Sequence, residues 1–211
     1  MSDMHSAEAG HYPRIAFVVD GPMVARFFLM LQQGVTIRRR VGCSVDAFLR
    51  KELEVGPAAI EKIQSIMLDG KPVDDIGTAL LHDGSVLALS AAMPGLVGAT
   101  LRRDGAYSSL RSAITYHETG QTCDPAEGWV NIKLFNLLMA ELGPGLLRQG
   151  VLVKTADLAD LLVERSPEFR QECSVTLGGK PIDIGMLKGN AELAGKDRIL
   201  LTVTHGSAMP D

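Results

Sequence analysis

The stretch Leu68-Asp69-Gly70-Lys71-Pro72-Val73-Asp74 recurs later in the chain as Leu177-Gly178-Gly179-Lys180-Pro181-Ile182-Asp183. A second pair of matching segments, Gln33-Gly34-Val35-Thr36-Ile37 and Gln149-Gly150-Val151-Leu152-Val153, is offset by nearly the same distance. The spacing is the length of one small domain, whereas the repeats of solenoid proteins are shorter. The repetition therefore predicts that one folding unit is duplicated along the chain.

The length of 211 residues suits two modest domains, each near the size at which one hydrophobic core becomes self-sufficient. The linker between them holds several large apolar residues, so we expect it to be ordered, to pack against both domains and to form a hairpin at Asp104-Gly105 followed by a helix. These apolar residues are Leu101, Tyr107, Leu110, Ile114 and Tyr116. The predicted divisions are a disordered leader (1–13), a first domain (14–97), the linker (98–128), a second domain (129–207) and a tail (208–211).

Apolar runs bounded by turn residues predict the same order of strands and helices in both units. Asp69-Gly70 is typical of a tight hairpin turn, Ser44 and Asp157 can each cap a helix, and Gly143-Pro144-Gly145 should end one. The predicted strands are 14–19, 35–41, 66–68 and 86–89 in the first unit, and 129–135, 151–154, 175–177 and 199–203 in the second. The predicted helices are 23–31 and 45–53, then 137–142 and one containing Leu158, Leu161 and Leu162.

Composition excludes several classes of protein. The net charge of −4 argues against a dedicated nucleic-acid binder, and no apolar run is long enough to span a bilayer. Cys43, Cys123 and Cys173 cannot all pair within one chain and form no Cys-x-x-Cys unit, so we expect reduced thiols. Residues 1–12 have neither a basic start nor an apolar stretch and resemble a disordered leader rather than a secretory signal, so we expect a cytoplasmic protein.

The second unit resembles the β-grasp sulfur carriers, meaning the small subunit of molybdopterin synthase and its thiamine-pathway relative, and more distantly ubiquitin. The first unit matches the same outline best at residues 68–74 and 83–89. The resemblance implies an α+β fold of two tandem β-grasp (ubiquitin-like) domains, each a mixed sheet with one main helix, joined by the ordered linker. The residues that carry it are 132–135, 138–143, 155–162, 177–183 and the closing strand.

In these families the chemistry resides in a flexible Gly-Gly terminus. Here the last strand runs into a segment with one glycine, Gly206, so we expect the scaffold without its donor chemistry. The predicted function is a non-catalytic β-grasp protein that binds another macromolecule, either a protein partner or a second copy of itself. Two alternatives stay open: a sulfur carrier or protein modifier activated by processing, and an enzyme that uses a linker thiol.

Candidate binding residues follow from strand alternation and from the linker. Arg38 and Arg40 share a strand face with Thr36, opposite Val35 and Ile37, and should project to solvent or to a partner. Arg39 has the parity of the buried residues, so it must pair or reach past the packed part of the sheet.

The linker contributes His117 and Cys123, which with Glu118 and Asp124 have the residue types of a thiol or metal site but match no ligand spacing. An incidental cluster is the simpler interpretation. Lys71-Pro72 and Lys180-Pro181 are explained by turn chemistry. We expect no catalytic residue, no metal site and no cofactor, because the sequence contains neither a phosphate loop nor a nucleophile with its base.

Overall fold

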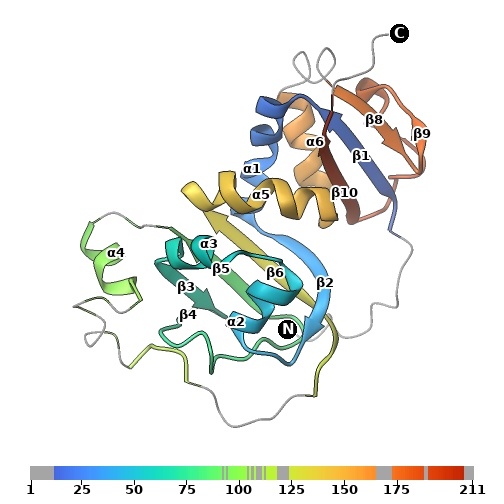
Figure 1. Ribbon diagram of the computed structural model, residues 1–211. Helices are drawn as coiled ribbons and strands as arrows, with labels where there is room; N and C mark the ends of the chain where they lie inside the picture. The colour runs from blue at the N-terminus through green and yellow to red at the C-terminus, as the bar shows by residue number, and fades with distance from the viewer. Residues whose placement is uncertain are drawn as a thin grey trace.

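The computed structural model describes residues 12–91, 93, 95–103, 105, 107, 111, 113–117, 124–164, 173–187 and 190–206. The described chain folds as one mixed β-sheet packed against helices (Figure 1), which confirms the predicted α+β class. The hairpin residue Asp104, and several residues of the segment in which a helix was predicted to follow it, lie outside the described residues. The elements nevertheless follow the predicted strands closely.

The strands, in chain order, are β1 (Arg14–Val19), β2 (Val35–Val41), β3 (Ser65–Leu68), β4 (Lys71–Pro72), β5 (Val86–Ser90), β6 (Ala126–Phe135), β7 (Val151–Lys154), β8 (Cys173–Leu177), β9 (Lys180–Pro181) and β10 (Arg198–His205). The helices are α1 (Phe28–Gln33), α2 (Val45–Ala47), α3 (Pro57–Lys62), α4 (Gly95–Leu101), α5 (Leu137–Gln149) and α6 (Thr155–Glu164). Short 3-10 helices, η1 (Gly21–Phe27) and η4 (Ile184–Met186), and a π-helical turn, η2 (Phe48–Glu52), complete the set.

The order of strands across the sheet is β4-β3-β5-β6-β2-β7-β10-β1-β8-β9. We call β4-β3-β5-β6-β2 lobe 1 and β7-β10-β1-β8-β9 lobe 2, and we call the junction of β2 with β7 the seam. The single residue pair Thr36 and Leu152 joins the two lobes there. From edge to seam, each lobe has the same orientations: an antiparallel hairpin, an antiparallel pair, a parallel pair and a final antiparallel pair.

Each lobe contains one strand from the opposite half of the chain. Strand β6, from the second half, lies between β5 and β2 in lobe 1, while β1, from the first half, lies between β8 and β10 in lobe 2. The sequence did not predict this exchange, because alternation of apolar residues sets which face of a strand is buried but not which strand lies beside it. The connections decide it: η1 and α1 carry the chain from β1 in lobe 2 to β2 in lobe 1, and α5 carries it from β6 to β7.

Helix α5 is longer than the sequence suggested. It continues through Pro144 to Gln149, so the prediction that Gly143-Pro144-Gly145 ends the helix is wrong. The physical reason is packing against α1: Gly143 is buried, and a Cβ there would lie 2.6 Å from Leu31 Cδ1. Gly143 therefore permits a close approach of two helices, and the contact of α5 with α1 offsets the hydrogen bond lost at Pro144.

The buried face of the sheet follows the predicted alternation. In β2, Val35 and Ile37 are buried, and in β6 so are Val130, Ile132 and Leu134. The helix after β2 begins as predicted, with the Ser44 hydroxyl accepting a hydrogen bond from the Ala47 N–H (3.2 Å). The helix after β7 differs, because it begins at Thr155 and places Asp157 in its first turn rather than at the cap.

Both repeated Lys-Pro segments form the outermost strands of the sheet. They leave tight turns in which both turn residues have positive φ, Asp69-Gly70 in lobe 1 and Gly178-Gly179 in lobe 2, as two-residue hairpins require. Proline lacks the N–H that a further strand would use, and lysine adds charge at the edge. The repeated motif thus both turns the chain and closes the sheet to further strand pairing.

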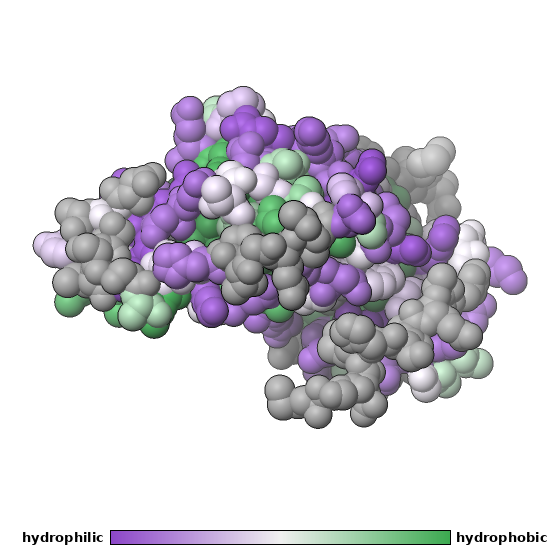
Figure 2. All heavy atoms as spheres, turned by 90° about the horizontal axis from the view of Figure 1, so that it is seen from below, coloured by the Kyte–Doolittle hydropathy of each residue, from purple (hydrophilic) through white to green (hydrophobic). Residues whose placement is uncertain are grey.

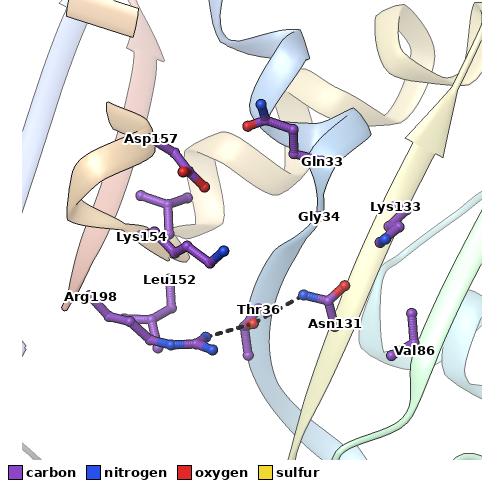
Figure 3. Close-up of a pocket in the computed structure, with 11 residues that line it drawn as sticks. Gln33, Gly34, Thr36, Val86, Asn131, Lys133, Leu152, Lys154, Asp157 and Arg198 are labelled. Carbon is purple, nitrogen blue, oxygen red and sulfur yellow. Dashed lines mark hydrogen bonds between the residues drawn. The ribbon is translucent and has the colours of Figure 1, made fainter. Parts of the chain in front are cut away.

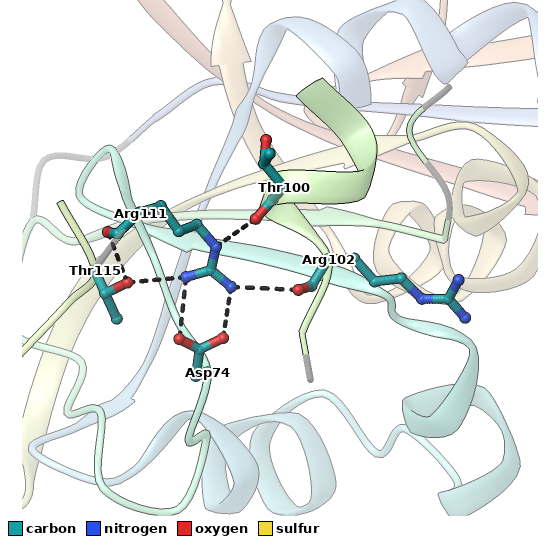
Figure 4. A network of polar contacts seen from close by, with 5 residues as sticks. All are labelled: Asp74, Thr100, Arg102, Arg111 and Thr115. Atoms are coloured by element: carbon teal, nitrogen blue, oxygen red, sulfur yellow. Dashed lines mark hydrogen bonds and ion pairs between the residues drawn. The ribbon is translucent and has the colours of Figure 1, made fainter. Parts of the chain in front are cut away.

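The described part of the linker packs on lobe 1 through a buried arginine (Figure 4). The Arg111 guanidinium donates two hydrogen bonds to the Asp74 carboxylate, and further ones to the Thr100 carbonyl (2.6 Å) and the Thr115 hydroxyl (2.9 Å). Its side chain is only 4% exposed. Because a buried guanidinium must be paired, this network fixes the described linker residues to the β4 end of lobe 1.

Among the described residues, no helix combines the length and apolar character needed to cross a bilayer. Polar side chains cover most of the face in Figure 2; apolar ones show in its middle and at its lower left edge, the side on which α4 lies in Figure 1. Leu96 and Val97 of α4 are 72% and 65% exposed. The helix has seven residues, so this apolar surface is small.

Candidate binding site at the seam of the sheet

The face of the sheet opposite the core is polar and basic near the seam. Register pairs Thr36 with Asn131 and Arg38 with Trp129, and paired residues point to the same face. Arg38 and Arg40 therefore lie on the Thr36 face, as predicted, and both side chains are exposed. We call this the outer face.

The Thr36 hydroxyl connects the two lobes. It accepts hydrogen bonds from Asn131 Nδ2 of β6 (3.3 Å) and from Arg198 Nη1 of β10 (3.0 Å), as Figure 3 shows. These strands lie on either side of the seam. A single hydroxyl thus holds side chains from both lobes in fixed positions at the point where the sheet has only one bridging residue pair.

A cavity of about 440 Å³ opens on the outer face at this point. It spans strands from β5 to β10, and its floor is the segment that leads from α1 into β2 (Figure 3). We call it the seam pocket. Its lining consists of Gln33, Gly34, Thr36, Val86, Asn131, Lys133, Leu152, Val153, Lys154, Asp157 and Arg198.

Gly34 gives the pocket its floor. Its φ of +119° is a conformation that side chains rarely adopt, and a Cβ there would lie 2.7 Å from Asn131 Oδ1. The Lys133 Cε atom would lie 3.2 Å from the same Cβ. The absence of a side chain at Gly34 therefore lets Asn131 and Lys133 lie close against the backbone.

The charge of the seam pocket is predominantly positive. Lys133 comes from β6, Lys154 from β7 and Arg198 from β10, and Asp157 of α6 is the carboxylate in the lining. Within the described part of the chain, neither lysine ammonium has an ion-pair or hydrogen-bond partner. An ammonium without a carboxylate partner on a recessed surface is suited to binding an anion.

The predicted arginines extend this basic surface along β2. Arg38 Nε lies 3.7 Å from Glu127 Oε2, and both side chains are more than half exposed, so the pair is weak. Arg40 is exposed, and its backbone N–H donates to Glu52 Oε2 (3.3 Å). Arg39 pairs on the opposite face as expected, donating to the Glu52 carbonyl (3.2 Å) and to Gln149 Oε1 (2.6 Å).

The linker residues proposed from the sequence do not join the seam pocket. His117 is exposed and is not part of the lining, and Cys123 and Glu118 lie outside the described residues. Across the described ranges, no group of three His, Cys, Asp or Glu residues could hold a metal ion. Arg111 and Tyr116 of the linker contact lobe 1 near β4, and no linker residue is among the described residues that line the seam pocket.

Cys43 illustrates why a thiol is a poor candidate in lobe 1. Burial, and then the negative charge of Glu52, raise the pKa of the Cys43 thiol above its ordinary value. Its Sγ atom donates to the Arg40 carbonyl at 3.8 Å. The neutral thiol is therefore favoured, whereas a nucleophilic cysteine needs the thiolate.

Sequence reasoning missed Lys133, Lys154, Asn131 and Arg198 as site residues. Each is on a strand that was predicted or extends one, and strand alternation could have placed Asn131 and Lys133 on the outer face with Trp129. Their convergence depends on the neighbours β6-β2-β7-β10, which the sequence does not encode locally. No family model, curated protein or solved structure matches this chain, so the site is interpreted from its own chemistry.

Proposed function

We propose that this chain is a non-catalytic binding protein of the tandem β-grasp type, and that its outer face at the seam binds an acidic segment of another protein. The observation that carries the proposal is the gathering of five basic side chains on one face of a chain whose net charge is −4. These are Arg38, Arg40, Lys133, Lys154 and Arg198. A basic surface on an acidic protein favours encounter with negatively charged partners and disfavours self-association through like surfaces.

The arrangement of each lobe supports the β-grasp part of the proposal. In both, the strand at the seam is followed by a helix and then by a hairpin at the outer edge, with a parallel pair of strands inside the sheet. This is the strand, helix and hairpin order expected of a β-grasp unit. The exchanged strands β1 and β6 complete the two lobes in equivalent orientations.

The edges of the sheet are poor binding surfaces for a strand-shaped partner. Both ends are two-residue Lys-Pro strands, and proline and lysine are the residues that oppose edge-to-edge pairing. The outer face at the seam is therefore the favoured surface. A protein segment suits it better than a nucleic acid, because Glu127 and Asp157 interrupt the basic surface and would repel a continuous phosphate backbone.

A cytoplasmic location is part of the same proposal. It rests on the sparse cysteines, which form no Cys-x-x-Cys unit.

The proposal can be tested with the fluorescence of Trp129, which is the single tryptophan and lies beside Arg38 on the outer face. A ten-residue glutamate peptide should change the emission on binding, and a lysine peptide of the same length should not. The double variant Arg38→Gln/Arg40→Gln should bind the glutamate peptide more weakly, and that binding should depend less on salt concentration. Equal binding of both peptides, or an unaffected double variant, would refute the proposal.

A further inference from the structure

We propose that the seam pocket is a binding site for a small phosphate monoester that also carries hydroxyl groups, such as a phosphorylated sugar. This site shares Lys133, Lys154 and Arg198 with the partner surface proposed above, but it goes beyond that surface because it adds Asp157 and Gln33 and does not use Arg38 or Arg40. The two proposals can therefore fail separately.

Two ammonium groups converge on the same space. Figure 3 shows Lys133 and Lys154 on opposite sides of the pocket, one on either side of Gly34, with their nitrogen ends turned toward the middle. Neither has a carboxylate partner among the described residues. Two uncompensated positive charges on either side of one space match a group of charge near −2, which a phosphate monoester carries at neutral pH.

Arg198 adds directed donors beside Thr36 in this space. One guanidinium nitrogen is used by the Thr36 hydroxyl at 3.0 Å, and that bond holds the side chain in place. The guanidinium has five N–H donors in all, so others stay available to an anion. Because the Arg198 guanidinium already donates to Thr36, it is less suited to binding a carboxylate through two parallel hydrogen bonds. The two lysines can bind a phosphate as point charges, so the site favours phosphate over carboxylate.

The other end of the pocket accepts hydrogen bonds. Asp157 and Gln33 lie beyond Lys154 in Figure 3, from α6 and α1 respectively. An ionised carboxylate is an acceptor only and would repel a second anionic group, so it favours hydroxyl or amine donors on the ligand. The ligand is thus anionic at one end and rich in donors at the other.

Size and lining exclude other phosphorylated molecules. The volume of about 440 Å³ is within the range of pockets that hold whole small molecules, which is more space than a bare ion fills. Among the described residues, the lining contains no aromatic side chain on which a nucleobase could stack; its apolar members are Val86, Leu152 and Val153. A sugar phosphate fits these limits better than a nucleotide.

Isothermal titration calorimetry on the full chain, with glucose 6-phosphate as the probe, tests the proposal. Glucose, inorganic phosphate and adenosine 5′-monophosphate serve as comparison ligands. The expected result is that glucose 6-phosphate binds more tightly than inorganic phosphate, and that glucose gives no measurable binding. Lys133→Gln and Lys154→Gln should each lower the affinity for glucose 6-phosphate by about tenfold or more, because each removes a charge-assisted hydrogen bond.

Matched variants separate this site from the partner surface. Lys71→Gln changes an exposed lysine at the far edge of lobe 1 and should leave the affinity unchanged, as should Arg38→Gln/Arg40→Gln. Asp157→Asn should reduce the ratio of the affinity for glucose 6-phosphate to the affinity for inorganic phosphate. Melting temperatures within a few degrees of the unmodified protein would establish that the variants are folded.

Three results would overturn the proposal. The first is no binding of glucose 6-phosphate at millimolar concentration, and the second is unchanged affinity in both lysine variants. The third, tighter binding of adenosine 5′-monophosphate, would refute the assignment of a hydroxyl-rich ligand body.

Discussion

The two halves of the chain carry the same short motifs but use them differently. Gln33-Gly34 and Gln149-Gly150 both end a helix and begin a strand, and both glycines have positive φ. Only the first opens the seam pocket, because Gln33 lines it, whereas Gln149 Oε1 accepts a hydrogen bond from Arg39. A repeated motif therefore sets the backbone at a position, while the neighbouring strands set what that position does.

The repeated aspartates show the same divergence. Asp74 pairs with the buried Arg111 in lobe 1, whereas the equivalent Asp183 in lobe 2 accepts a hydrogen bond from the Gly185 N–H (2.6 Å) and caps η4. One copy braces the linker against its lobe, and the other closes a single helical turn. The two copies of the motif therefore share a backbone role, while their last residues make different contacts.

Removing the ion pair between Arg111 and Asp74 should have the largest effect on stability. Arg111→Met removes the buried charge partner of Asp74 and the guanidinium donor of the Thr100 carbonyl. We expect the unfolding free energy to fall by about 3 kcal/mol, the lower end for buried pairs, because Asp74 is partly exposed. Asp183→Asn in lobe 2 should cost about 1 kcal/mol or less, as a weakened cap. Urea unfolding of both variants measures the contrast, and equal losses would show that the Arg111–Asp74 pair contributes no more to stability than the Asp183 cap.

The next largest difference in stability is expected between variants of Gly34 and Gly150. Gly34→Ala and Gly150→Ala each force a side chain into a positive-φ backbone, at about 1–3 kcal/mol. Gly34→Ala should lose roughly 1 kcal/mol more, since its Cβ would meet Asn131 Oδ1 at 2.7 Å, while the nearest atom to a Cβ at Gly150 is Leu200 Cδ1 at 3.7 Å. Denaturant midpoints of the pair give the difference. A more stable Gly34→Ala would mean that the pocket floor is not as tight as described.

The basic residues of the outer face should matter little for folding. Arg38→Gln/Arg40→Gln removes two exposed charges, and the ion pair of Arg38 with Glu127 is long (3.7 Å), so stability should change by about 0–1 kcal/mol. Thermal unfolding checks this. If the double variant unfolds, then the arginines belong to the core side of β2 and the assignment of faces is wrong.

The smallest effect concerns the Cys43 thiol of lobe 1. Because burial raises its pKa, the neutral thiol is favoured in the folded state. The associated stability is present below the pKa of the unfolded chain and is lost as pH rises through the folded pKa. In a protein whose other cysteines are serine, the pH midpoint for iodoacetamide alkylation should be higher in the folded state than in denaturing urea. A lower folded midpoint would reverse the assigned cause.

Local structure was predictable from the sequence to the extent that it depends on local chemistry. The Ser44 cap, the Asp69-Gly70 turn and the alternation of Thr36 with Val35 and Ile37 all follow from neighbouring residues. Pro144 and Gly143 were misread because a helix contact with Leu31, far away in sequence, decides whether the helix continues.

The candidate site was less accessible to prediction. Lys133, Lys154 and Arg198 come from three strands, and only the exchange of β1 and β6 between lobes and the bridge at the seam bring them together. The lobes differ from the domains predicted with boundaries at residues 97 and 129. Strand β6 follows the first domain in the sequence, but it lies in lobe 1 in space. Long-range strand pairing is set by topology and not by local pattern.

The seam between β2 and β7 underlies both proposals, and a cross-link tests it most directly. Paired residues on antiparallel strands have Cα atoms about 4.5–5.5 Å apart, a separation that a disulfide can bridge. In a protein with Cys43, Cys123 and Cys173 replaced by serine, Thr36→Cys/Leu152→Cys should form a disulfide within one chain, as detected by mass spectrometry of proteolytic fragments. Thr36→Cys/Thr176→Cys, which reaches to the far side of lobe 2, should not. Free thiols at 36 and 152 under the same oxidation would contradict the joined sheet and the site built on it.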